Sequence, residues 1–139
     1  MIFLLKFYIR KNPQYRIEQQ NTLLRDRKMK AKVFYQEFCL NGYATASCEL
    51  VVDQDNAVFV REYDFTKGTR EKFIDEIFRT MNMLNIPPDH PERPLFEKAG
   101  HTSMSIGDYI RFDDGTVMVV SPVGWKAFYN CPETGILKS

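Results

Sequence analysis

Histidine and serine side chains lie close together in the sequence at His101, Ser103 and Ser105. A histidine can serve as general base toward a serine hydroxyl, and Asp108 follows as a further acidic group, so a small hydrolase or nuclease is one candidate activity. Serines that alternate just before a strand are more typical of capping and turn-forming hydroxyls, and no nucleophile elbow surrounds them. We therefore predict no catalytic residue and keep the hydrolase or nuclease as an alternative.

The residue types that hold metals and cofactors are scattered along the chain. His90 and His101 are the only histidines, and neither has a second ligand at the spacing of a zinc site. There is no Walker A loop and no dinucleotide fingerprint. The three cysteines include no CxxC pair, which is typical of reduced thiols. Since no apolar run reaches about 18 residues, we expect a cytoplasmic protein with no membrane span, no metal and no cofactor.

Basic residues are concentrated at the N-terminal end. Residues 1–30 hold eight Lys and Arg against two Asp and Glu, a net charge of +6, whereas the rest of the chain has a net charge of −5. Such asymmetry is typical of an arm that binds nucleic acid or a partner. The candidate phosphate-contacting residues are Arg10, Lys11, Arg16, Arg25, Arg27, Lys28 and Lys30.

The chain of 139 residues is short enough for a single domain. We divide it into a basic arm or extension, residues 1–30, and one domain, residues 31–139. Met29 is also a candidate natural start, in which case residues 1–28 are an addition to the domain. The opposite interpretation, in which the arm is integral to the fold, stays open.

Residue patterns predict strands in the first half of the domain. Residues 33–40 are rich in Val, Phe and Tyr, and the Asn-Gly pair at 41–42 is a strong signal for a two-residue hairpin turn. Residues 43–52 are then a second strand and residues 57–65 a third, with a turn cluster between them. Two consecutive hairpins make an antiparallel meander.

A helical period follows these strands. Large apolar side chains repeat at the i, i+3, i+4 spacing from Phe73 to Leu84, and Thr69 is a candidate N-cap. We expect a loop at 87–100, a hairpin at 109–120, a last strand at 123–128 and an irregular tail. The predicted fold class is α+β: an antiparallel β-meander packed by one amphipathic helix, with a small C-terminal β-hairpin unit.

Residues 101–128 contain a distinctive motif. Its parts are His-Thr-Ser-Met-Ser-Ile-Gly-Asp-Tyr-Ile at 101–110, Asp-Gly at 114–115 and Val-Gly-Trp-Lys at 123–126. The motif resembles the C-terminal part of small proteins from phages, plasmids and integrated elements, the YodL-like group among them. In that group a Ser-x-Ser-x-Gly-Asp unit leads into a strand, a tight Gly hairpin and a closing Gly-Phe/Trp-Lys. The resemblance implies no reaction, but it implies a setting in which small proteins bind host machinery, including defence systems.

The motif also has a purely structural interpretation. Gly107 permits a positive φ before the strand, and Asp108 can accept hydrogen bonds from nearby backbone amides. Trp125 would cover the end of the small sheet while its indole N–H finds an acceptor. The alternative is a partner-binding surface on which these residues converge: Ser103, Ser105, Asp108, Trp125 and Lys126. We expect a non-catalytic binding protein that engages a host protein, with nucleic-acid binding through the arm as the alternative.

Overall fold

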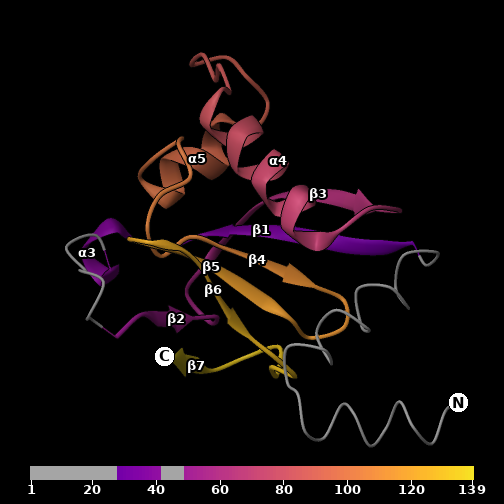
Figure 1. The fold of residues 1–139 in the computed structure, drawn as a ribbon. Coiled ribbons are helices and arrows are strands. Elements are labelled where there is room, and N and C mark those ends of the chain that lie inside the picture. The colour runs from indigo at the N-terminus through magenta and orange to yellow at the C-terminus, as the bar shows by residue number, and fades with distance from the viewer. Residues whose placement is uncertain (1–27, 42–48) are drawn as a thin grey trace, which may run out of the picture.

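The computed structural model describes residues 28–41 and 49–139, and these form an α+β fold (Figure 1). Five strands make the main sheet in the order β3–β1–β4–β5–β6, and every neighbouring pair is antiparallel. Their bounds are β1 Met29–Tyr35, β3 Val58–Phe65, β4 Tyr109–Phe112, β5 Val117–Ser121 and β6 Gly124–Phe128. Because β1 lies between β3 and β4, the sheet joins segments that are far apart in the sequence.

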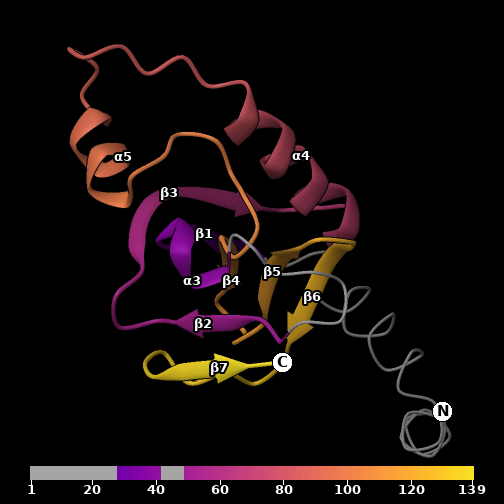
Figure 2. The ribbon, with the colours of Figure 1, turned by 90° about the vertical axis from the view of Figure 1, so that its left-hand side faces the viewer.

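Different layers cover the two faces of the main sheet. Helices α4 (Arg70–Asn82) and α5 (Arg93–Ala99) lie on one side. A second sheet, made of β2 (Val51–Asp53) and β7 (Ile136–Lys138), lies on the other side (Figure 2). The main sheet is therefore the middle layer.

A separate hydrophobic core fills each of the two spaces between layers. The larger core packs Ile74 and Ile77 of α4 against strand residues that include Phe112. The smaller core packs Val52 of β2 against residues of β4 and β5 that include Val119. Each fully buried side chain of this kind contributes about 1.5–3 kcal/mol relative to its exposed state.

The predicted amphipathic helix is confirmed as α4. Thr69 is its N-cap, and the Thr69 side-chain oxygen accepts a hydrogen bond from the backbone N–H of Lys72 at 3.3 Å. Of the predicted apolar face, Ile74, Ile77 and Met81 are buried, and the other three residues, Phe73, Phe78 and Leu84, are half-buried and pack against the same core. The sequence period therefore identified both the helix and the face that packs on the sheet.

The predicted hairpin after the first strand is wrong. Strand β1 ends at Tyr35, and residues 38–41 form the short helix α3 (Phe38–Asn41) instead of continuing the strand. Strand β1 pairs directly with β3, whereas β2, at the end of the predicted second strand, pairs with β7. The Asn41 side chain bonds both the N–H and the C=O of Val51, at 2.9 and 2.7 Å, so it occupies backbone groups that a hairpin partner would use. Residues 42–48, the remainder of the predicted turn and strand, lie outside the described residues.

Two further elements occur where the sequence predicted irregular chain. Residues 93–99, within the expected loop, form α5, which has a proline in its first turn and ends at Gly100 with a φ of +89°. The C-terminal tail forms β7, whose three residues pair with those of β2. Proline at a helix start and glycine at its end are helix-boundary signals, although four prolines in one segment also suggest a loop.

Strand β1 begins at Met29, so Met29 and Lys30 belong to a strand inside the main sheet. The Lys30 ammonium bonds Asp64 on β3 at 2.7 Å, and its backbone N–H donates to the Asp113 carboxylate at 2.9 Å. The last residues of the predicted arm are thus part of the fold. Residues 1–27 lie outside the described residues, and the arm stays a prediction.

Candidate functional site

Asp108 forms a polar centre inside the protein. Asp108 is only 1% exposed, and its two carboxylate oxygens accept three hydrogen bonds. The backbone N–H groups of Gln36 and Ser105 donate at 2.9 and 2.7 Å, and His101 Nε2 lies 2.8 Å from Oδ2. The predicted role of Asp108 as an acceptor of backbone amides is confirmed. Because it is enclosed by these donors, its carboxylate is not part of a contact surface.

His101 is held beside Asp108 by stacking as well as by hydrogen bonding. Its ring lies parallel to the ring of Tyr35, with the centroids 4.7 Å apart, and the Tyr35 hydroxyl donates to the Thr102 carbonyl at 2.9 Å. Burial disfavours the charged imidazole. The hydrogen bond and charge of Asp108, together with a backbone hydrogen bond to Ala99, outweigh that effect and raise the pKa of His101 above its usual value.

Gln36 and Asn41 extend this centre toward β2, and the sequence did not indicate either of them. The Gln36 amide donates to the carbonyls of Gly107 and Val51 at 2.7 and 3.0 Å, and its oxygen accepts the Asp53 N–H at 2.8 Å. Gly107 has a φ of +96°, as predicted, and a Cβ there would lie 2.8 Å from the Asn41 side-chain nitrogen. Tight packing and full hydrogen bonding therefore link the end of β1 to the start of β4.

The geometry does not assemble a serine–histidine pair. None of the described hydroxyl groups forms a hydrogen bond with His101, and its Nε2 faces Asp108. Ser103 is exposed, and the Ser105 hydroxyl donates to the Ser103 carbonyl at 3.1 Å. The Ser105 hydroxyl is therefore a local turn-bonding group, as the structural interpretation of the motif predicts.

Trp125 and Lys126 lie on β6, and neither is among the groups that bond the Asp108 carboxylate. The Trp125 indole N–H donates to Asp75 of α4 at 3.2 Å, and its ring makes an edge contact with Phe78, with centroids 5.9 Å apart. This confirms that the indole finds an acceptor at the end of the sheet. No hydrogen bond or ring contact joins Asp108 to Trp125 or to Lys126, which is exposed. Whether Trp125 and Lys126 contact a partner stays a prediction.

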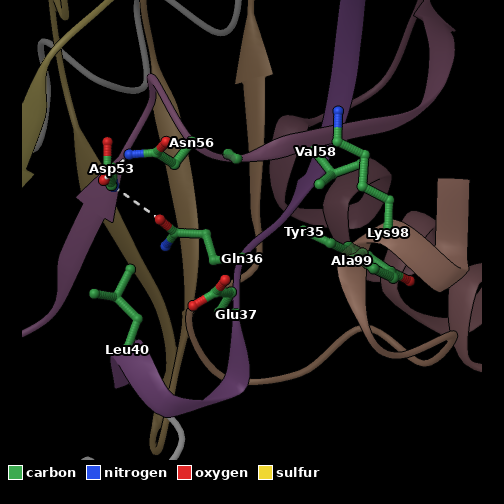
Figure 3. A pocket seen from close by; sticks show the side chains of 10 residues that line it. Tyr35, Gln36, Glu37, Leu40, Asp53, Asn56, Val58, Lys98 and Ala99 are labelled. Carbon is green, nitrogen blue, oxygen red and sulfur yellow. Dashed lines mark hydrogen bonds between the residues drawn. The ribbon is translucent and has the colours of Figure 1, made fainter.

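A hollow of about 320 Å³ lies beside the polar centre around Asp108, between the end of β1 and α3 (Figure 3). We call it the β1 hollow. Its walls come from the end of β1, from α3, from the turn between β2 and β3, and from the end of α5. The lining residues are Tyr35, Gln36, Glu37, Leu40, Asp53, Asn56, Ala57, Val58, Lys98 and Ala99.

Apolar side chains line part of the β1 hollow. Leu40 is 40% exposed, and Ala57 and Val58 are half-buried. Apolar surface in a concavity that also holds a few polar groups is typical of a binding site.

Three charged residues line the β1 hollow: Asp53, Glu37 and Lys98. Figure 3 shows Asp53 and Asn56 on one side, Lys98 on the other, and Glu37 between the two sides. The Asp53 carboxylate is fixed in place, because it accepts hydrogen bonds from the Asn56 amide at 2.7 Å and from the Asp55 N–H at 3.2 Å. None of the described residues forms an ion pair with Lys98.

Two of the predicted nucleic-acid contacts lie in the described part of the chain. Lys28 and Lys30 both pair with Asp64, at 3.5 and 2.7 Å. The hydrogen bond from Lys30 lowers the pKa of the Asp64 carboxyl, so this pair is ionised at neutral pH. The other predicted contacts, Arg10, Lys11, Arg16, Arg25 and Arg27, lie outside the described residues.

Within residues 28–41 and 49–139, no three His, Cys, Asp or Glu side chains are grouped as metal ligands. The helices found in these ranges are all too short or too polar to cross a membrane. No family model, curated protein or solved structure matches the chain.

Proposed function

We propose that this protein is a non-catalytic binding protein that holds a partner protein at the β1 hollow. The observation that carries the proposal is the contrast between two neighbouring groups of residues. Asp108 and Gln36 are buried and bonded to one another and to their neighbours, so their hydrogen bonds stabilise the fold. Two of the residues that line the β1 hollow instead present groups to the outside: Leu40 presents apolar surface, and Asp53 presents a carboxylate held in place by hydrogen bonds.

The motif at residues 101–128 supplies the proposed setting. Its resemblance to small proteins of phages and plasmids suggests a host protein as the partner, with a defence system as one class of target. The physical argument for the β1 hollow does not depend on that setting. It requires only a partner that buries Leu40 and the neighbouring apolar residues.

The test is affinity capture from a bacterial lysate with three forms of the full chain. Leu40→Glu places a charge at the rim of the hollow and should abolish capture of a protein that the wild type retains. Met83→Glu is the matched control, because Met83 is 76% exposed at the end of α4 and does not line the hollow. Equal capture by both variants would count against the hollow. A Trp125→Ala, Lys126→Glu double variant tests the motif surface in the same experiment.

The basic composition of residues 1–30 favours a second candidate function, nucleic-acid binding through the arm. Labelled duplex DNA and single-stranded RNA should then bind the full chain in a salt-dependent way, and a chain starting at Met29 should not bind. Fluorescence anisotropy at two salt concentrations measures both effects. Equal binding by the two forms would show that the arm is not needed for nucleic-acid binding. No binding by either form would exclude nucleic-acid binding as a function.

A further inference from the structure

We propose that the β1 hollow accepts a lysine or arginine side chain from an extended segment of the partner protein. This inference rests on the proposed function and adds the chemistry of the contact. The hollow, at about 320 Å³, is near the lower limit of sites that enclose a whole small ligand. Its size therefore suits one or two side chains of a peptide better than a cofactor.

The walls of the hollow match the two parts of a long basic side chain. Leu40, Ala57 and Val58 provide an apolar surface against which an aliphatic stem can pack. Asp53 provides a carboxylate on one side, held at a fixed position by Asn56 and by the Asp55 N–H. Each carboxylate oxygen accepts one of these hydrogen bonds and has a further lone pair for a cationic donor.

The charges also distinguish between classes of partner. A phosphate group would be repelled by Asp53, so the hollow is poorly suited to a nucleic-acid backbone. Lys98, on the opposite side, can bind a backbone carbonyl or an acidic side chain next to the basic residue. Because Asp53 and Lys98 lie on different sides of the hollow, their opposite charges give the peptide a preferred direction.

The binding of a cation can be measured without knowing the partner. Nα-acetyl-arginine amide and the neutral analogue Nα-acetyl-citrulline amide have nearly the same shape, so they differ mainly in charge. In an NMR titration of the full chain, the arginine amide should shift the signals of residues that line the hollow. It should bind about fivefold more tightly than the citrulline amide, as expected for one partly exposed ion pair.

Variants of single carboxylates test the assignment to Asp53. Asp53→Asn keeps an oxygen acceptor for the turn but loses the charge, and it should reduce the preference for the arginine amide, although the second lining carboxylate, Glu37, remains. Glu76→Gln, at an exposed position on α4, has the same change in charge and should keep the preference. The spectrum of each variant shows directly whether it is folded.

The results separate this inference from the proposed function. Equal shifts with the two amides, or no shift with either, would overturn the assignment of a basic side chain. So would a preference for arginine that Asp53→Asn leaves unchanged. If capture of the partner protein is nevertheless lost in Leu40→Glu, the hollow is still the contact site and only the chemistry of its occupant is wrong.

Discussion

Replacing Asp108 should destabilise the fold strongly, because one buried side chain satisfies three hydrogen-bond donors. In Asp108→Ala, the N–H groups of Gln36 and Ser105 and the His101 ring lose their acceptor together. The hydrogen bond from Gln36 is buried, so water cannot easily replace the carboxylate there. The other two hydrogen bonds are partly buried, and water can compensate for some of their loss.

The size of the effect follows from these three donors. Leaving a buried donor without an acceptor costs about 1–3 kcal/mol. We assign about 2 kcal/mol to the Gln36 N–H and about 1 kcal/mol to each partly buried donor, which gives about 4 kcal/mol for Asp108→Ala. Asp108→Asn keeps one oxygen but turns an NH₂ group toward at least one donor, so we expect a loss of about 2 kcal/mol.

Urea unfolding followed by circular dichroism measures both losses, provided that the slope of the transition is unchanged. Asp113→Ala is the matched control, because the exposed Asp113 carboxylate also accepts a backbone N–H, from Lys30 at 2.9 Å. We expect that control to lose less than about 1 kcal/mol, since water replaces the exposed carboxylate. If Asp108→Ala lost no more free energy of unfolding than Asp113→Ala, the central role of Asp108 would be refuted.

Two further predictions concern the same centre. The pKa of His101 is raised above 6.5 in the folded state. The stabilisation from its protonated ring is therefore complete below pH 6.5, and it is lost as the pH rises through the folded-state pKa. The urea midpoint of the wild type should therefore fall between pH 6 and pH 8, and a fall of equal size in His101→Gln would contradict this. Gly107→Ala should lower the melting temperature more than Gly68→Ala. The alanine would have to adopt a φ of +96°, and its Cβ would lie only 2.8 Å from the Asn41 side-chain nitrogen. Gly68 has a similar φ of +89° and no atom within 4 Å of such a Cβ, so equal losses would show that backbone strain alone decides the outcome.

Local patterns explain which elements could be predicted from the sequence. Helix α4 has a regular apolar period and an N-cap, and both are local signals that the packed structure preserves. Strand β7 has no such signal, because its three residues are ordered by pairing with β2, which lies 83 to 87 residues earlier in the chain. Strand β1 was predicted, but not its direct pairing with β3. Which strands pair depends on which distant segments pack their apolar side chains on the same face of the sheet, and no short stretch of sequence contains that information.

The candidate site was predictable only where its chemistry is local. A positive φ at Gly107 and backbone hydrogen bonding by Asp108 follow from the Gly-Asp sequence before a strand, and both are present. The roles of Gln36 and Asn41 depend on contacts with residues from 10 to 72 positions away, so the sequence did not reveal them. The β1 hollow was missed for the same reason, since its walls come from three separate segments of the chain, residues 35–40, 53–58 and 98–99.

Gln36 connects the stability of the fold to the shape of the β1 hollow. Its backbone N–H bonds Asp108, and its side-chain oxygen accepts the N–H of Asp53, which lines the hollow. A loss of the Asp108 acceptor therefore removes one of the four hydrogen bonds that hold Gln36, the residue that fixes the position of the Asp53 backbone. Binding at the hollow and the integrity of the buried centre are thus expected to change together, because one glutamine side chain holds the wall of the site to the core.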